Sequence, residues 1–300
     1  MDGILNIDKP RGKTSFQVVA WVRRLSGERR VGHGGTLDPE ATGVLPVFLG
    51  KGTRLLEYLI DARKTYRAVV MLGAATDTYD ASGRITSQCD PLSISLSDIE
   101  SAVSFFTGII QQTPPMYSAI KRKGVPLYRW ARAGIEVSRE ARQVEFSRID
   151  VVQCAVPEFT LEVECSKGAY IRSLAHDLGQ KLGVGAHLKS LVRTRSGPFR
   201  IEDSVDMAQI DGASREERLH EILLPIDIAV AHLPSVQVGE ADEAAIVNGR
   251  PPELTAWQGP AEGQCRAYAE DGRLLAILSR DAEKGCWRPR KVLVRSAGEA

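Results

Sequence analysis

The sequence lacks long apolar runs and has few cysteines among its 300 residues. No apolar run approaches the roughly 20 residues that a membrane-spanning helix needs. The opening segment, MDGILNIDKP, has no basic stretch followed by an apolar one, so we expect no secretory signal. The five cysteines are scattered and contain no C-x-x-C pair. We therefore expect no disulfide framework and no zinc site, and a reducing cytoplasm as the compartment.

The chain as a whole lacks an excess of charge of one sign, because its formal net charge is +1. Individual regions, however, are strongly acidic or basic. Residues 201–245 hold 11 acidic and 2 basic side chains and are expected to form a solvated connector. Residues 1–200 hold 28 basic and 20 acidic ones. Within them, the segments 11–33, 121–134 and 181–200 interleave basic with aromatic residues, which predicts a surface that binds a polyanion. Solvated helix faces are the alternative interpretation.

Nucleotide-binding loops are also missing, although the sequence has glycine-rich turns. A phosphate-binding loop has the pattern G-x-x-x-x-G-K-[ST], and Gly50-Lys51 could supply its G-K pair. The first glycine of the pattern is then replaced by Leu45, and the final serine or threonine by Gly52. The segment GHGGTL has Leu37 in place of the third glycine of a dinucleotide fingerprint. Both nucleotide readings fail on spacing.

Metal-binding patterns are absent as well. His33 and Asp38 lie five residues apart in a loop, with no neighbouring side chain to complete a ligand set. Asp77 and Asp80 do not fit the spacing of a calcium loop, so TDTYDASG is expected to be a polar turn. We expect no metal ion and no cofactor.

The order of the predicted elements favours an α+β fold, because consecutive strands lie close enough to pair antiparallel. A capping box at Ser97 and Glu100 is expected to open one helix, and Asp271-Gly272 is expected to form a hairpin turn. We expect one domain over 1–234 and a small β-rich module over 235–300. The predicted strands are 3–10, 64–73, 142–154 and 158–165, and the predicted helices are 14–27, 52–62, 95–108, 126–134 and 169–183.

The segment VGHGGTLDPEATGVL, residues 31–45, places one carboxylate, Asp38, on a glycine-rich turn. Glycines let a bulky ligand approach the backbone, and Pro39 fixes the chain directly after Asp38. A carboxylate without a second carboxylate or a metal beside it suits nucleophilic catalysis better than paired acid–base hydrolysis. A purely structural turn remains open from this loop alone.

Five segments, in this order, closely resemble the bacterial TruB-type tRNA pseudouridine synthases. They cover about residues 3–200 and read ILNIDKPRGKTS, VGHGGTLDPEATGVLPVFLGKGT, KTYRAVVMLGAATDTYDASG, QTPPMYSAIKRKGVPLYRWARAG and SKGAYIRSLAHDLGQKLGVGAHLKSLVRT. The family often has threonine at the position of Gly34, a change expected to be minor. The resemblance implies the pseudouridine synthase fold, a mixed, mostly antiparallel sheet flanked by helices, with an RNA-clamping loop at about 111–134. The terminal segment resembles the family's small PUA-like RNA-binding module.

The resemblance also implies a reaction. The family isomerises one uridine in the T-loop of tRNA, at position 55, by breaking the N1–C1′ bond, rotating the base and rejoining it through C5. Asp38 would be the nucleophile, Tyr66 would stack on the target base, and Arg172 would pair with Asp38. Tyr170 would contact the target nucleotide, and His33 would fill the space left by the flipped base. The residues implied to line the pocket, to support the site or to bind RNA are Leu191, Lys9, Lys64, Lys121, Arg122, Lys123, Arg129 and Arg132.

Physical reasoning agrees with these roles. A stacked base must be extruded before it can react, and an aromatic side chain can hold it outside the stack. We expect Arg172 to lower the pKa of Asp38 by about 1–3 units and keep it ionised. The expected partner is the T-arm and elbow of tRNA, the expected state is a monomer, and no membrane is involved.

Two other functions stay open on the sequence alone. One is a tRNA-folding chaperone whose catalysis is incidental. The other is a guide-RNA-dependent enzyme that acts on ribosomal RNA, as archaeal and eukaryotic relatives of the family do. The segment PPMYSAIKRKG and the short terminal module favour the stand-alone bacterial type.

Overall fold

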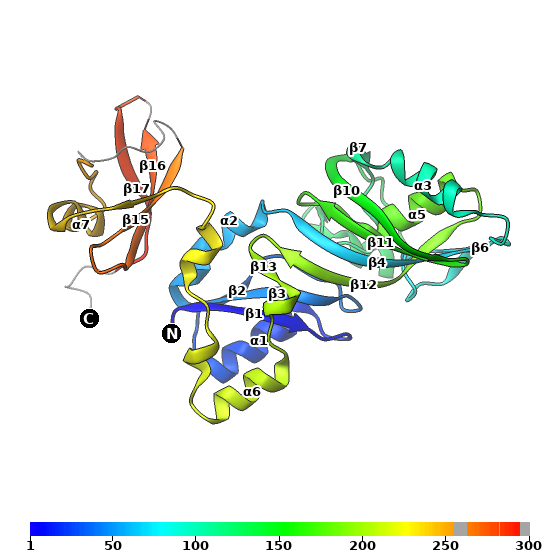
Figure 1. Cartoon of the computed structure of the whole chain (residues 1–300). Coiled ribbons are helices and arrows are strands. Elements are labelled where there is room, and N and C mark those ends of the chain that lie inside the picture. Colours follow the sequence, from blue (N-terminus) through cyan, green and yellow to red (C-terminus); the bar gives the residue numbers. More distant parts are fainter. Residues whose placement is uncertain (255–262, 282, 295–300) are drawn as a thin grey trace.

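The computed structural model of the chain describes residues 1–254, 263–281 and 283–294. A nine-stranded sheet forms its body, in the order β1-β3-β12-β4-β11-β10-β7, with β2 paired to β3 and β13 paired to β12 (Figure 1). Among these described strands only β12 and β3 run parallel, which confirms the mixed, mostly antiparallel sheet. The strands are β1 (Gly3–Lys9), β2 (Val31–His33), β3 (Thr42–Leu49), β4 (Lys64–Leu72), β7 (Gly108–Gln112), β10 (Arg142–Ala155), β11 (Glu158–Cys165), β12 (Ala186–Ser196) and β13 (Phe199–Arg200).

Helices flank this sheet and share one apolar core with it. Helices α1 and α6 lie against the half that holds β1, and α3 and α5 lie against the half that holds β10 and β12 (Figure 1). The helices are α1 (Ser15–Ser26), α2 (Leu56–Ile60), α3 (Leu96–Ser104), α4 (Leu127–Arg132), α5 (Ile171–Lys181), α6 (Met207–Arg215) and α7 (Glu240–Val247).

Helix α1 forms as its sequence predicts. The Thr14 side chain accepts a hydrogen bond from the Gln17 backbone, the Gln17 side chain accepts one from the Thr14 backbone, and Gly27 ends the helix with a φ of 65°. Helix α3 differs by two residues at its start. Its capping box is Ser95 with Asp98, so the prediction of Ser97 with Glu100 is wrong. Both serines precede the apolar run, and only Ser95 keeps an extended backbone that lets its hydroxyl reach a free N–H.

Two further predicted helices are shorter than expected. The segment predicted as a helix at 52–62 is a 3₁₀-helix over Gly50–Leu55 followed by α2. Glycine is a poor helix former, and Gly50 adopts a left-handed φ of 58°. Its backbone also packs closely against Met1 and Asp2. In the segment predicted at 126–134, Pro126 caps α4 from outside rather than opening its first turn.

A four-stranded sheet with α7 forms the small β-rich module near the C-terminus, as expected. Its strands are β14 (Ser235–Gln237), β15 (Gln264–Tyr268), β16 (Leu274–Asp281) and β17 (Cys286–Val292), and the predicted hairpin turn joins β15 to β16. Ile277 and Leu293 of this module share an apolar cluster with Leu55 and Leu59 of the body. Residues 255–262, 282 and 295–300 of the predicted module lie outside the described residues.

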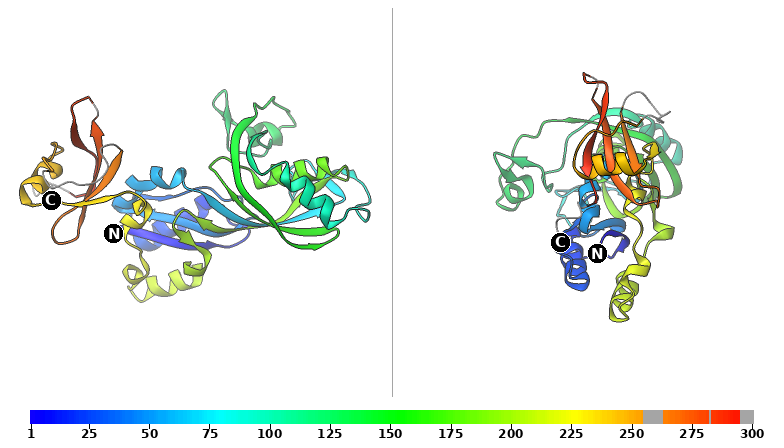
Figure 2. Two further views of the ribbon diagram at one scale, coloured as in Figure 1. Left: turned by 45° about the horizontal axis from the view of Figure 1, so that its top comes forward. Right: turned by 90° about the vertical axis from the view of Figure 1, so that its left-hand side faces the viewer.

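The segment 113–134 projects from the body beside the sheet (Figure 2). It carries α4 and a short hairpin of β8 (Lys121–Arg122) and β9 (Val125–Pro126). A second small hairpin, β5 (Ala74–Thr76) and β6 (Ile85–Gln88), brackets the turn at 77–84. Of the helices in the described ranges, none is long and apolar enough to cross a membrane.

Candidate active site

Asp38 sits on the loop that joins β2 to β3, and this loop is anchored on both sides of the carboxylate. The Leu37 backbone exchanges hydrogen bonds with the Ser15 hydroxyl, at 2.9 and 3.1 Å. The Pro39 carbonyl accepts from the Gly12 backbone at 2.8 Å and from Lys9 Nζ at 3.2 Å. The Asp38 side chain keeps 45% of its surface open, so the loop presents a fixed carboxylate to a ligand.

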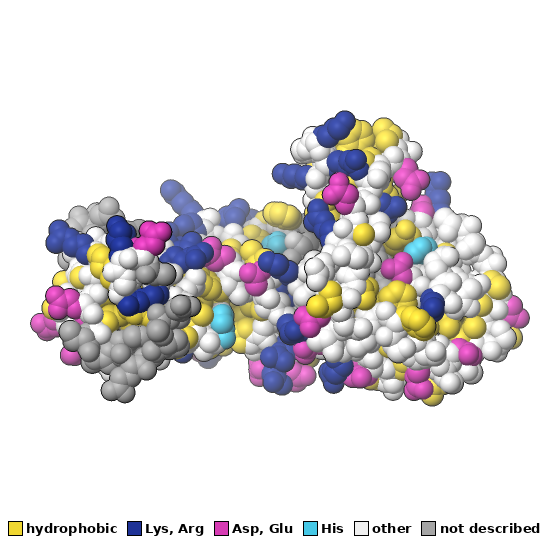
Figure 3. Space-filling model, turned by 90° about the horizontal axis from the view of Figure 1, so that it is seen from above, with side chains coloured by type: hydrophobic (Ala, Val, Ile, Leu, Met, Phe, Trp, Pro, Cys, Tyr) yellow, Lys and Arg dark blue, Asp and Glu magenta, His cyan; other side chains and the backbone are white. Residues whose placement is uncertain are grey.

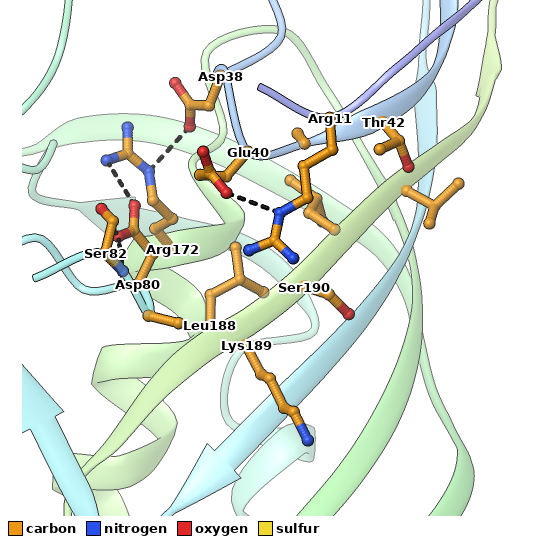
Figure 4. A pocket seen from close by; sticks show the side chains of 14 residues that line it. Arg11, Asp38, Glu40, Thr42, Asp80, Ser82, Arg172, Leu188, Lys189 and Ser190 are labelled. Carbon is orange, nitrogen blue, oxygen red and sulfur yellow. Dashed lines mark hydrogen bonds and ion pairs between the residues drawn. The ribbon is translucent and has the colours of Figure 1, made fainter. Parts of the chain in front are cut away.

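The Arg172 guanidinium faces Asp38 from the first turn of α5. Its Nε lies 3.0 Å from Asp38 Oδ2, as the sequence predicted (Figure 4). Its Nη1 lies 3.4 Å from Asp80 Oδ2, and its Nη2 donates to the Tyr117 carbonyl at 3.0 Å. The Arg172 side chain is only 7% exposed, and all its nitrogens are engaged. The cation is therefore fixed in one orientation.

Asp80 is a second carboxylate at the site, so the interpretation of Asp38 as a carboxylate without a partner is wrong. The expected polar turn is present, because Asp80 Oδ1 accepts hydrogen bonds from Thr78 and Ser82. Its other oxygen reaches across to Arg172 (Figure 4). Two carboxylates thus share one guanidinium, an arrangement that sequence spacing cannot show because 42 residues separate them.

Arg172 acts on the pKa of Asp38 in the expected direction, but the pKa is raised overall. Although 45% of the side-chain surface stays open, the residues packed around the carboxyl group displace enough water to raise its pKa. The charge of Arg172 lowers it, and the neighbouring charge of Asp80 raises it again. The expectation that Arg172 would hold the pKa low counted the cation but neither the exclusion of water nor the second carboxylate.

Tyr66 on β4 and Tyr170 at the start of α5 both lie close to this pair. Burial raises the pKa of each phenol, and the charge of Asp38 contributes to both shifts. Gln112 holds Tyr170 by a reciprocal pair, accepting from its backbone N–H at 2.8 Å and donating to its carbonyl at 3.0 Å. Both phenols remain neutral. The structure pairs Asp38 with Arg172 as predicted, and the roles of the two tyrosines stay predictions.

The two predicted lysines support the backbone of the site. Lys9 Nζ donates to the carbonyls of Pro10, Lys13 and Pro39, and burial lowers the pKa of Lys9 to about 8. Lys64 Nζ donates to three carbonyls at the end of α2, and burial lowers the pKa of Lys64 to about 8 as well. Neither ammonium pairs directly with a carboxylate among the described residues.

His33 lies on β2, where its ring meets the exposed Phe16 edge to face at 5.7 Å. Its Nδ1 accepts from the Gly35 backbone at 3.3 Å, and burial with the charge of Arg193 lowers its pKa. His33 is therefore neutral at pH 7. At Gly34, a Cβ atom would meet Leu59 Cδ2 at 2.2 Å, so the family's threonine would require that leucine to move.

Arg193 is a site residue that sequence reasoning missed. It is 1% exposed, although its segment was predicted to be a basic surface. Its Nε donates to the Val44 carbonyl and its Nη2 to the Gly35 carbonyl, so it fixes both ends of the Asp38 loop from behind. Gly43 is needed here, because a Cβ would lie 2.3 Å from the Arg193 carbonyl oxygen. The sequence did contain a sign of this burial. Arg193 lies two residues after the apolar Leu191, so both side chains point to the same, buried face of β12.

A recess of about 150 Å³ opens beside Asp38 (Figure 4). Arg172, Asp80 and residues 188–192 line it, and Leu191 is among them as predicted. Arg11 and Glu40 form an ion pair of 2.7 Å at its edge. The recess exposes the Asp38 carboxylate beside an apolar wall, and neither Tyr66 nor Tyr170 is among the residues that line it.

The five cations predicted to bind RNA are exposed and lie on the projecting segment, on β8 and α4 and at the turn between β8 and β9. Figure 3 shows Lys and Arg side chains both on this projection and on the body beside it. They are Lys121, Arg122, Lys123, Arg129 and Arg132.

Comparisons with known proteins agree with this geometry. Residues 23–171 match the TruB family pseudouridylate synthase (N terminal domain), and residues 172–231 match the tRNA pseudouridylate synthase B C-terminal domain. A protein of Dehalococcoides mccartyi, named tRNA pseudouridine synthase B, is 46% identical over 98% of this chain and 97% of its own. Proteins of the same name from Heliobacterium modesticaldum and Geobacillus thermodenitrificans are 45% and 42% identical, over 98% and 97% of this chain and 96% and 99% of their own.

The fold is also similar to solved structures. A chain in the crystal structure of a Cbf5-Nop10-Gar1 complex matches with a TM-score of 0.75 and 28% identity, over 98% of this chain and 85% of that one. A chain in a structure of an H/ACA RNP bound to a substrate RNA containing 2′-deoxyuridine also matches, with a TM-score of 0.73 and 26% identity. The match covers 97% of this chain and 85% of that one.

Proposed function

The chain belongs to the TruB family of pseudouridylate synthases, and on this premise we propose that it is a tRNA pseudouridine synthase, an isomerase that acts on the uridine at position 55 of the T-loop. The observation that carries the proposal is the ion pair of Asp38 with Arg172 at the edge of an open recess. The pair supplies one anionic oxygen in a fixed direction, next to two neutral tyrosines.

The reaction needs no external reactant. The N1–C1′ bond breaks and a C5–C1′ bond forms, while C5 gives up a proton and N1 gains one. Asp38 is proposed as the nucleophile, which requires its ionised form. Arg172 keeps the carboxylate in its direction of attack and partly offsets the rise in its pKa.

A base stacked inside the T-loop cannot reach Asp38, so the target nucleotide is proposed to flip out of the stack toward Asp38. Tyr66 stacks on the flipped base, and Tyr170 contacts the same nucleotide. Leu191 provides the apolar wall of the recess, and the His33 ring beside the exposed Phe16 takes the space that the base leaves. The cations of the projecting segment bind the T-arm phosphates.

Sequence likeness supports tRNA over a guided ribosomal RNA target. The relatives named tRNA pseudouridine synthase B are 42–46% identical to this chain over nearly its full length. We propose the cytoplasm as its compartment, because a tRNA substrate is found there and the free cysteines suit a reducing environment.

The test is incubation of the protein with an unmodified tRNA transcript, followed by mapping of pseudouridine along the RNA. We expect one modified position, in the T-loop, and none in a matched transcript that carries cytidine at that position. Modification elsewhere would refute the substrate site, and no modification would refute the activity. A folding chaperone would instead accelerate tRNA folding without any modified base.

A further inference from the structure

An aromatic stack beside the catalytic pair has no part in the chemistry described so far. The rings of Tyr79 and His176 lie 3.9 Å apart between centroids, with their planes at 15°. Tyr79 directly precedes Asp80, and His176 lies one helical turn after Arg172 on α5. The stack therefore connects the loop that carries Asp80 to the helix that carries Arg172.

The backbone at Tyr79 has a φ of 64°, a left-handed conformation that bulky side chains rarely adopt. Such a conformation persists only where surrounding contacts hold it. The Leu188 N–H donates to the Tyr79 carbonyl at 3.0 Å, and the Ala81 N–H donates to the Leu188 carbonyl at 2.9 Å. These bonds fix the backbone on either side of Asp80 to β12, and the stack fixes the side chain at the turn.

The turn at Tyr79 decides where Asp80 points. With the left-handed backbone at Tyr79, Asp80 Oδ2 lies 3.4 Å from Arg172 Nη1, and the Thr78 carbonyl lies 3.5 Å from the same nitrogen. An extended backbone at residue 79 would carry the carboxylate away from α5. On α5, the ring of His176 opposes this change at Tyr79, alongside the contacts that Arg172 makes with Asp80 and the Thr78 carbonyl.

His176 is suited to this position because its ring is uncharged at neutral pH. Its Nδ1 is buried and finds no hydrogen-bond partner within the part of the chain that the structure describes. Burial and the charge of Arg139 lower the pKa of His176. The stack is therefore one of two neutral rings, whose attraction is short-ranged and depends on their geometry.

We propose that the Tyr79–His176 stack is a positioning element that holds Asp80 against Arg172 and thereby sets the orientation of the guanidinium toward Asp38. This inference rests on the proposed function, in which Asp38 and Arg172 perform the isomerisation. Tyr79 and His176 are not among the residues that line the recess, so their effect passes through Asp80.

The experiment separates the ring from the backbone strain. Tyr79→Gly accepts the positive φ without cost but has no ring. Tyr79→Phe and His176→Phe keep a ring at each position, and His176→Leu removes one. For each full-length variant, the single-turnover rate of pseudouridine formation and the Kd for tRNA are measured. A crystal structure of each gives the distance between Asp80 Oδ2 and Arg172 Nη1.

We expect Tyr79→Gly and His176→Leu to lower the single-turnover rate by about 10- to 100-fold through misplacement of the guanidinium. Their Kd for tRNA should stay within about threefold, and both phenylalanine variants should keep the wild-type rate within about threefold. Asp80 should move out of reach of Arg172 only in the variants without a ring. A Tyr79→Gly protein that keeps both the rate and the ion pair of Asp80 with Arg172 would overturn the inference.

The structural readout does not depend on turnover. If the wild-type protein modifies no tRNA, the proposed function fails, and the distances in the variants still decide whether the stack positions Asp80. If the wild-type protein is active and all four variants keep Asp80 beside Arg172, the positioning role fails and the proposed function stands.

Discussion

Replacement of Arg172 by lysine tests whether the guanidinium acts through its charge or through its geometry. The variant Arg172→Lys keeps one positive charge in the same buried place. A lysine has a single ammonium, however, and cannot contact Asp38, Asp80 and the Tyr117 carbonyl from the positions that Nε, Nη1 and Nη2 now occupy.

The size of the effect follows from these interactions. Suppose that the lysine ammonium still pairs with one of the two carboxylates. The variant then lacks the charge-assisted hydrogen bond to the other carboxylate and the hydrogen bond to the Tyr117 carbonyl. Each hydrogen bond to a charged group contributes about 1.5–3 kcal/mol, so the two together amount to about 3–6 kcal/mol. If most of this stabilisation is missing in the transition state, the single-turnover rate falls by roughly 10²- to 10⁴-fold.

The assay is single-turnover pseudouridine formation with tRNA binding measured in parallel. Arg148→Lys is the matched control, because Arg148 also contacts two carboxylates, those of Asp150 and Glu162, but on the exposed face of β10. We expect the control to keep the wild-type rate and Arg172→Lys to keep only the tRNA affinity. An Arg172→Lys rate within about threefold of wild type would refute the geometric role of the guanidinium.

Further predictions concern the charges around Asp38 and the supporting residues. Asp80→Asn removes a like charge that raises the pKa of Asp38, so the acid limb of the rate profile, measured against pH, should shift to lower pH. The folded-state pKa of Asp38 is raised, so its ionised form lowers the stability of the folded state above that pKa, and this cost disappears as the pH falls through it. Thermal unfolding should therefore show Asp38→Asn to be more stable than wild type at neutral pH, with the difference shrinking in acid. Lys64→Met leaves three backbone carbonyls without their donor and should lower the free energy of unfolding in urea by about 1–3 kcal/mol. Glutamine at the five cations of 121–132 should weaken tRNA binding and reduce the slope of log K against log salt by about 0.9 for each phosphate that the protein no longer neutralises.

The elements predicted from the sequence are those whose periodicity is regular. Helices α1 and α5 and strands β4, β10 and β11 were predictable because apolar residues recur at helical or alternating spacing. Strands β2 and β3 were not predicted. Seven of the eight residues in β3 are buried, so no alternation marks it, and Gly43 and Pro46 are typical of a loop.

The site was predictable where the residues of a motif act on each other directly. The pairing of Arg172 with Asp38 follows from the family resemblance. The part played by Asp80 does not, because a local polar turn fully accounts for its sequence context. The raised pKa of Asp38 could not be predicted either, since it depends on how much water the folded loops exclude.

The central claim is that ionised Asp38 reacts with a flipped uridine while Arg172 holds it in place. The most direct test is the Asp38→Asn variant, which keeps the size of the side chain and removes its negative charge. We predict that it binds unmodified tRNA with the wild-type Kd and forms no pseudouridine in a single-turnover assay. Formation of pseudouridine by this variant at the wild-type rate would contradict the account.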